Sequence, residues 1–251
     1  MRIRHVKGSE EYVAASPFVI QRPEDHKGRF SKEVFGNDAP LRLEVGMGMG
    51  TFIRELAASD PGHNYIGFEL NTTVLYKALR RYERQLLGEA GTERAEEAPS
   101  AVEERDERGA SEERPSAITE ATGNLRFIRS DARFLSDYFS EGEIDRIYLN
   151  FSDPWPKDKN ANKRLTSQVF LEHYKHILKD GGMVEFKTDN RGLFDYSMET
   201  FPAAGFEIKT MTYDLHHDPE LSKGNIMTEY EAKFSAKGNP ICRLTAVYFK
   251  K

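Results

Sequence analysis

The chain has 251 residues, of which 38% are hydrophobic and 31% are charged, as is typical of a globular protein large enough to bury one substantial core. No apolar stretch approaches the roughly 18 continuous residues of a membrane helix, and no apolar run follows the charged start Met1–Lys7, so we expect neither a membrane span nor a secretory signal. Cys242 stands alone, which excludes an internal disulfide and favours a reducing, cytoplasmic location.

The formal net charge of −5 at first argues against a nucleic-acid partner, but the negative charge is concentrated in one segment. Residues 88–123 contain eleven acidic residues against four arginines, a charge of −7, so the rest of the chain carries +2. The same segment has no aromatic residue and cannot bury enough apolar surface to offset the entropy of ordering it. We therefore predict a single domain over 1–251 with a mildly basic folded part and a disordered acidic insertion at about 88–123.

Two strand–helix units are expected before the insertion. An apolar strand over 41–45 leads into the glycine turn 46–50, and a helix over 51–58 follows. A second strand over 64–69 ends in an acid, and a long helix runs from about Val74 through Tyr82.

The alternation resumes after the insertion. In the helix predicted over 166–178, the apolar spacing indicates that Val169 and Leu178 face inward. Strands that alternate with helices predict an α/β fold with a doubly wound, mostly parallel, seven-stranded sheet. The later strands are expected at 125–128, 144–151, 182–187, 206–213 and 241–249, with helical segments at 134–139, 166–178, around 194–201 and at 228–236.

The segment Asn150–Lys157 is the most informative stretch of the chain. It follows an apolar strand, and its two prolines favour a stiff turn that holds Asp153 and Trp155 where open α/β sheets bind ligands. A basic run follows directly, so the segment suggests a site for a base that is attached to phosphates. A proline-rich surface loop with a core tryptophan is the structural alternative. The cations of the run are Lys157, Lys159, Lys163 and Arg164.

The glycine turn and three strand-end acids suggest a nucleoside cofactor without a pyrophosphate. Thr51 stands where the dinucleotide pattern needs a third glycine, and Glu44 precedes the glycines, where it can meet a cationic amino-acid tail such as that of S-adenosylmethionine. Glu69, nineteen residues beyond Gly50, is placed to bind ribose hydroxyls. Asp131 could accept from an adenine amine, or it could simply cap the helical turn that follows it.

Several other candidates have structural explanations. Asp189 and its neighbours could cap a helix, and Thr228–Glu231 matches the capping box. His173 and His176, like the adjacent His216 and His217, have no nearby cysteine or carboxylate at ligand spacing, so we expect no metal site.

The chain resembles the bacterial tRNA (guanine-N7-)-methyltransferases on both sides of the insertion, from about residue 1 to the end. The most specific motifs, as they stand here, are Glu44–Gly50, Gly67–Glu69, Asn150–Lys157, Phe186–Asn190 and Gly224–Glu231. The insertion is longer and more acidic than the family pattern. The resemblance implies a class I, Rossmann-like fold, S-adenosylmethionine as the cofactor, and tRNA as the partner of a monomer or homodimer.

The resemblance also implies a role for particular residues. Asp153 would be the catalytic acid, and the methyl group would go to a guanosine in the variable loop. The cofactor pocket would be lined by Glu44, Gly46, Gly48, Glu69, Asp131 and Asp153. The substrate would be contacted by Lys157, Asp189, Thr228, Glu229, Tyr230 and Glu231, and the tRNA by Lys159, Asn160, Ala161, Asn162, Lys163 and Arg164.

Three rival functions were weighed on the same residues. Exocyclic-amine methyltransferases have a turn similar to Ser152–Trp155, but that turn usually has a second consecutive proline, which is missing here. A nicotinamide dehydrogenase is disfavoured by Thr51 and by the acid before the glycines. A non-catalytic RNA-binding protein would not need Glu44, Glu69 and Asp131 together.

Overall fold

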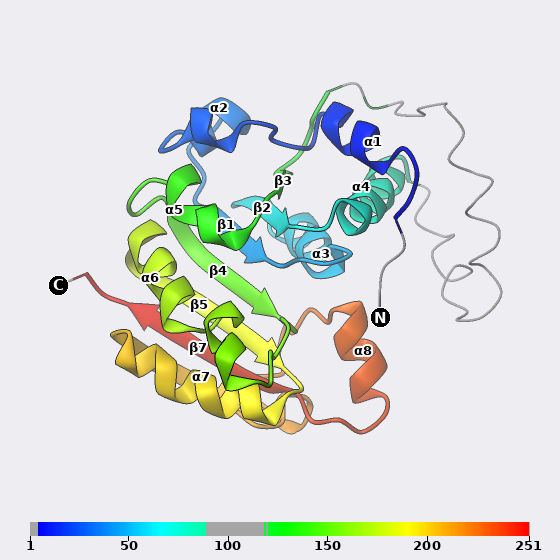
Figure 1. Cartoon of the computed structure of the whole chain (residues 1–251). Helices are drawn as coiled ribbons and strands as arrows, with labels where there is room; N and C mark the ends of the chain where they lie inside the picture. Colours follow the sequence, from blue (N-terminus) through cyan, green and yellow to red (C-terminus); the bar gives the residue numbers. More distant parts are fainter. Residues whose placement is uncertain (1–4, 89–117, 119, 251) are drawn as a thin grey trace.

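A seven-stranded sheet organises the computed structural model, which describes residues 5–88, 118 and 120–250 (Figure 1). Its strand order is β3-β2-β1-β4-β5-β7-β6. Strand β7 alone runs in the direction opposite to the other six strands. The predicted doubly wound, mostly parallel sheet is therefore confirmed. The strands are β1 (Leu41–Val45), β2 (Asn64–Glu69), β3 (Leu125–Arg129), β4 (Ile144–Asn150), β5 (Leu178–Thr188), β6 (Phe206–Thr212) and β7 (Cys242–Tyr248).

Helices cover both faces of the sheet, because side chains of one strand alternate between two hydrophobic clusters. Leu41, Leu43 and Val45 of β1 point into the cluster under α5, α6 and α7, so Glu44 faces the other side, under α3 and α4. The helices are α1 (Ser9–Ala15), α2 (Phe30–Val34), α3 (Thr51–Ser59), α4 (Thr72–Leu86), α5 (Leu135–Tyr138), α6 (Gln168–Ile177), α7 (Arg191–Ala203) and α8 (Glu229–Ser235), and the 3-10 turns are η1 (Pro23–His26), η4 (Ala132–Phe134), η5 (Asp158–Lys163) and η6 (Leu215–His217).

The amino-terminal part contains elements that were not predicted from the sequence. Helix α1 packs along α4, with the rings of Tyr12 and Tyr76 meeting edge to face at 5.0 Å (Figure 1). The following segment runs beside β3, where Phe127 N donates to Phe18 O at 2.9 Å and Ile20 N donates to Phe127 O at 2.8 Å. This segment covers the outer edge of the sheet, which would otherwise expose unpaired backbone groups.

Two expectations for the region after β4 are wrong. Val169 is 43% exposed, because the inward face of α6 is formed by Phe170, Leu171 and Tyr174 instead. Helix α6 ends at Ile177, and Leu178 begins β5, four residues earlier than predicted, by pairing with Ile144. The strand continues through Gly181 and Gly182.

Most of the predicted insertion lies outside the described residues. At its end, Ile118 and Ala121 pack against the cluster that contains Tyr82 and Phe127. Arg126 donates to the carbonyls of residues 121, 122 and 123, at 3.1, 3.0 and 3.1 Å. The packed part of the chain therefore resumes before residue 123, earlier than the predicted boundary.

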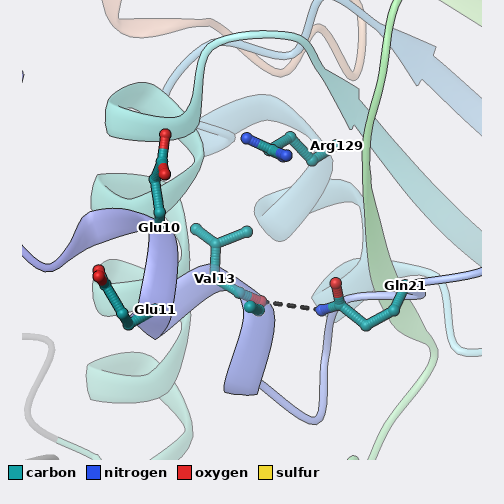
Figure 2. A pocket seen from close by; sticks show the side chains of 6 residues that line it. Glu10, Glu11, Val13, Gln21 and Arg129 are labelled. Atoms are coloured by element: carbon teal, nitrogen blue, oxygen red, sulfur yellow. Dashed lines mark hydrogen bonds between the residues drawn. The ribbon is translucent and has the colours of Figure 1, made fainter.

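A cavity lies between α1 and the end of β3 (Figure 2). It is lined by Glu10, Glu11, Val13 and Ala14 of α1, together with Gln21 and Arg129. The Gln21 amide closes one side by donating to the Val13 carbonyl at 2.9 Å, as Figure 2 shows. None of the predicted site residues lines this cavity. In the described part of the chain, no helix combines the length and the apolar character needed to cross a bilayer.

Candidate active site

The predicted acids gather at the carboxyl ends of the parallel strands. Strands β1 and β4 are neighbours, and the chain continues from β1 towards one edge of the sheet and from β4 towards the other. Such a switch point leaves a crevice for ligands in open α/β sheets. Glu44 lies near the end of β1, Glu69 ends β2, and Asp153 lies in the loop that follows β4.

The glycine turn brings backbone N–H groups to this crevice. Gly46, Gly48 and Gly50 have φ values of 73°, 58° and 72°, in the left-handed region that side chains disfavour. Gly46 N and Met47 N both donate to the Phe68 carbonyl, at 2.8 and 3.1 Å, which fixes the turn against β2. Gly67 is required for a different reason, because a Cβ there would collide with the sulfur of Met47.

Glu44 has an orphaned oxygen that fits a bound cation. Its side chain is 1% exposed, and its Oε1 accepts from Asn150 Nδ2 at 2.8 Å across the β1–β4 junction. Burial raises the pKa of Glu44 to about 8, although the Asn150 bond and the charge of Lys187 act in the opposite direction. Glu44 Oε2 and Asn150 Oδ1 are buried and lack a hydrogen bond of ordinary geometry among the described residues, although the backbone N–H of Ile53 also acts to lower the pKa of Glu44. Two unpaired buried acceptors suit the ammonium group of an amino-acid cofactor tail.

Glu69 is oriented by two backbone donors. Its Oε2 accepts from Gly48 N at 3.1 Å, and its Oε1 accepts from Asn71 N at 2.8 Å. Burial raises the pKa of Glu69, and the negative charge of Asp153 adds to that effect. The carboxylates of Glu69 and Asp153 therefore share one site. Each Glu69 oxygen keeps a lone pair for a hydroxyl donor, as the expected ribose contact requires.

Asp131 adopts the structural role that the sequence left open. It caps η4 by accepting from Arg133 N at 2.9 Å. Its carboxylate also receives Arg133 Nε at 3.0 Å and Nη2 at 2.8 Å, and this hydrogen bonding lowers the pKa of Asp131. A cofactor contact by Asp131 remains a prediction.

The loop after β4 carries backbone strain at two bulky residues. Phe151 and Trp155 have φ values of 52° and 41°, a region that non-glycine residues rarely adopt. Arg164 holds the loop in this shape, because it is buried and donates through Nε to the Pro154 carbonyl at 3.0 Å and through Nη2 to the Trp155 carbonyl at 3.1 Å. The guanidinium also lies 4.3 Å from the ring centroid of Tyr196. Strained backbone that is fixed in this way is typical of functional sites.

The loop presents Asp153 to solvent. Asp153 is exposed and forms no hydrogen bond or ion pair within the described ranges. Trp155 is half-buried, with Lys163 Nζ 4.7 Å from its ring centroid. In the predicted RNA-contacting run of η5, Lys159, Asn162 and Lys163 are exposed, Asn160 and Ala161 are half-buried, and Arg164 is buried as the support of the loop.

A buried ion pair fixes the segment before α8 against the end of β5. Lys187 and Glu231 are both 0% exposed, and Lys187 Nζ lies 2.7 Å from Glu231 Oε2. The same ammonium donates to Asn225 Oδ1 at 3.0 Å and to the Ile226 carbonyl at 2.8 Å. On the main chain, Phe151 N donates to the Lys187 carbonyl at 2.9 Å. Lys187 therefore connects the strained loop to α8.

The predicted substrate residues divide into anchors and accessible groups. Thr228 caps α8 by accepting from Glu231 N at 2.9 Å, as the capping box predicts. Glu229 accepts from Thr51 Oγ1 at 3.1 Å and pairs with Arg81, and Glu231 is fully enclosed. The accessible groups are Lys157, Tyr230 and Asp189, and Tyr230 OH donates to Asp189 Oδ2 at 3.3 Å.

Sequence reasoning assigned no role to Asn150 or Lys187, although both lie within motifs that it singled out. The available signal was a polar side chain at the end of an otherwise apolar strand in both cases. No three His, Cys, Asp or Glu side chains of the described residues gather in a way that could hold a metal ion. His173 and His216 are engaged instead with Ser136 Oγ at 2.8 Å and with Glu231 Oε1 at 3.1 Å.

Comparisons with known proteins agree with this geometry. Residues 38–244 match the family described as "Putative methyltransferase". A tRNA (guanine-N(7)-)-methyltransferase from Lachnoclostridium phytofermentans is 44% identical over 246 residues, which cover 98% of each chain. Another of that name, from Geobacillus sp. (strain WCH70), is 42% identical over 249 residues, covering 99% of this chain and 96% of the relative. Other relatives of that name include one from Streptococcus pyogenes, 42% identical over 247 residues.

Solved structures show the same fold at low sequence identity. An antibiotic-related methyltransferase superposes with a TM-score of 0.55 at 16% identity, covering 89% of this chain and 92% of the other. The 16S rRNA methyltransferase KamB superposes with a TM-score of 0.56 at 11% identity, covering 88% and 93%. With the near-complete match to the curated relatives, the chain belongs to the bacterial tRNA (guanine-N7-)-methyltransferase family of S-adenosylmethionine-dependent enzymes.

Proposed function

We propose that this chain transfers a methyl group from S-adenosylmethionine to N7 of a guanosine in tRNA, forming 7-methylguanosine, and that the target lies in the variable loop. The reaction and the substrate follow from the relatives' names, and the loop position follows from the resemblance. The observation that carries the chemistry is the exposed, unpaired carboxylate of Asp153, whose charge acts on the pKa of Glu69, on a strained loop that Arg164 holds in place.

The cofactor would be held by groups that already lack partners or point into the crevice. Glu44 would receive the ammonium of the methionine tail, and Glu69 the ribose hydroxyls. Leu70 and Phe134, which are 63% and 47% exposed and lie near Glu69 and Asp131 in the chain, offer apolar surface for the adenine ring. Once bound, the cofactor supplies a methyl group on a positively charged sulfur.

The chemistry at N7 needs an anion and no general base. Guanine N7 carries an in-plane lone pair and no proton, so its attack leaves a cationic ring. The negative charge of Asp153 would stabilise that positive charge as it develops, an electrostatic contribution that is often the largest in catalysis. The rigid loop would add alignment of the base with the methyl group. Lys157, Asp189 and Tyr230 would hold the nucleotide, and Lys159 and Lys163 would meet tRNA phosphates.

One observation favours a second candidate, an exocyclic-amine methyltransferase. Ser152 Oγ is buried next to Asp153 without a partner in the described part of the chain, and a hydroxyl could accept from an amine hydrogen. That reaction must also release a proton, which would make Asp153 a base.

Substrate class is tested by incubating the purified chain with radiolabelled S-adenosylmethionine and, in parallel, bulk tRNA, ribosomal RNA, DNA or no acceptor. The proposal expects label in tRNA well above every other acceptor. Label found chiefly in ribosomal RNA or DNA would remove tRNA as the substrate, and cofactor binding without transfer to any acceptor would favour a non-catalytic role.

A further inference from the structure

Helix α8 has an unusual distribution of side chains. Its buried residue is an acid, Glu231, whereas its aromatic residues Tyr230 and Phe234 are exposed and half-buried, respectively. Surface helices normally bury their apolar stripe and expose their charges. Tyr230 is 42% exposed, and Met227, just before the helix, is 43% exposed. An apolar face that the fold leaves uncovered beside the active site indicates a partner.

The aromatic residues form a continuous stack that begins in the strained loop. The ring centroids of Phe151 and Tyr230 are 5.0 Å apart, and those of Tyr230 and Phe234 are 4.1 Å apart with an interplanar angle of 21°. The hydroxyl of Tyr230 is held by Asp189. The stack therefore extends from the catalytic loop along α8, which stands beside the ends of β4 and β5 in Figure 1.

Two cations border the outer ring of the stack. Lys237 Nζ and Lys233 Nζ lie 5.1 and 5.9 Å from the ring centroid of Phe234. Both side chains are exposed, and neither has a carboxylate partner within the described ranges. Tyr230 already stacks on one face of the Phe234 ring, so a base would stack on the other face, and the ammonium groups that lie over the ring would meet its phosphates.

The helix is held rigidly enough to serve as a platform. Glu231 is locked by Lys187 below it, Glu229 is tied to Thr51 and Arg81, and Thr228 closes the amino-terminal turn. These anchors are polar and lie beneath the helix, so the aromatic face is left free. A pre-organised surface loses little conformational freedom when it binds.

We propose that Phe234, with Lys233 and Lys237, forms a stacking platform for an unpaired tRNA nucleotide that neighbours the methylated guanosine. The inference rests on the proposed function, because it takes tRNA as the occupant. A second copy of the chain is the alternative occupant. The unpaired cations favour RNA, since an aromatic face destined for a homodimer gains nothing from two uncompensated charges.

The test compares Phe234→Leu, which keeps apolar volume but loses the π-face, with Phe234→Tyr, which retains it. Affinity for unmodified tRNA is measured by fluorescence anisotropy, the affinity for S-adenosylmethionine by calorimetry, and KM and kcat by methyl transfer. Phe234→Leu should weaken tRNA binding about tenfold, with a matching rise in KM for tRNA and unchanged cofactor affinity. Phe234→Tyr should restore tRNA affinity, which a merely structural defect would not predict.

The chain offers a matched control at the opposite end of the sheet. Phe249 is 49% exposed with Lys209 Nζ 5.4 Å from its ring centroid, so it matches the ring and the nearby lysine away from the site, although Lys209 is paired with Glu207. Phe249→Leu should leave tRNA affinity unchanged. The double variant Lys233→Gln/Lys237→Gln should reduce the log–log salt slope of tRNA binding by roughly 1.5.

Two results would overturn the platform. Wild-type tRNA affinity in Phe234→Leu would show that the ring stacks on no base, and a shift from dimer to monomer in sedimentation would assign the face to a second copy. Neither tRNA affinity nor the oligomeric state depends on which methylated product the enzyme forms. A chain that binds tRNA through Phe234 but makes no 7-methylguanosine would refute the proposed function alone, and active Phe234→Leu with unchanged KM would refute the platform alone.

Discussion

Three carboxylates at the site have different surroundings and therefore different tasks. Glu44 is buried, its pKa is raised to about 8, and one of its oxygens lacks a hydrogen-bond partner among the described residues. Glu69 is oriented by two backbone N–H groups, and Asp153 is exposed and unpaired. In the proposed mechanism, charge recognition, hydroxyl recognition and stabilisation of a cationic product would therefore fall to separate residues.

Asp153→Asn removes the charge and keeps the size of the side chain. We expect turnover to fall on the order of a hundredfold or more, because one electrostatic stabiliser of the developing cation is lost. Since Asp153 is exposed and supports no other described residue, the melting temperature should not change. Single-turnover methyl transfer and calorimetric melting measure the two quantities. Near wild-type turnover would show that Asp153 is not the catalytic acid.

Glu44 should make the cofactor-free protein less stable as pH rises. Its folded pKa is raised, so the folded state holds the proton more tightly than the unfolded state does. The stabilisation is fully present below the unfolded pKa and is lost as pH rises between about 4.5 and 8. Urea unfolding across this window should show a decline that Glu44→Gln lacks. Parallel profiles for the two proteins would mean that Glu44 is already ionised without cofactor.

At the scale of elements, α8 depends on polar anchors, so its attachment should be sensitive to single charges. Lys187→Met leaves Glu231 buried without its cation, which should cost about 3–5 kcal/mol of unfolding free energy. In the double variant Lys187→Met/Glu231→Gln, no unpaired charge remains, and part of that loss should be recovered. Urea denaturation of the wild-type protein, the two single variants Lys187→Met and Glu231→Gln, and the double variant gives the coupling energy. Additive losses would show that the pair is not coupled.

The basic turn η5 should contribute to tRNA affinity through exposed charges only. Lys159→Ala/Lys163→Ala should reduce the log–log salt slope of tRNA binding by roughly 1.5 and leave cofactor affinity unchanged. Lys32→Ala/Lys209→Ala removes two exposed lysines of α2 and β6 and serves as the control. Equal salt slopes of tRNA binding in the two double variants would show that the lysines of η5 do not contact tRNA.

The same elements show how far sequence reasoning reaches. The strands were predictable because β1, β2 and β4 are apolar runs buried on both faces, and the glycine turn has a pattern that only a tight turn explains. The anchoring of α8 could not be predicted, because Lys187 and Glu231 are 44 residues apart and meet only in the folded chain. Arg164 was assigned to RNA contact as part of the basic run. Its burial could not be predicted, because its partners are two carbonyls of the strained loop that come together only in the folded chain. Helices α1 and α2 are too short for a clear apolar period.

At the scale of the whole molecule, the groups assigned to cofactor and base lie together at the carboxyl ends of the parallel strands. Strands β1, β2, β4 and β5 carry Glu44, Glu69, Asn150 and Lys187 there, and α8 stands beside them (Figure 1). Tyr230 and Phe234 of the aromatic stack belong to α8. The opposite end of the sheet carries a network around Arg42, Asp60 and Asp145 that has no place in the proposed chemistry.

The identity of the methylated nitrogen tests the central claim most directly. Methylation at N7 leaves a fixed positive charge on guanine, and the ring opens in mild alkali and permits strand scission, whereas a methylated exocyclic amine ends neutral and survives. End-labelled tRNA treated with the enzyme and S-adenosylmethionine, and then with mild alkali and aniline, should be cut at a single guanosine in the variable loop. Fully methylated tRNA that remains uncut would contradict N7 transfer and assign the methyl group to an exocyclic amine.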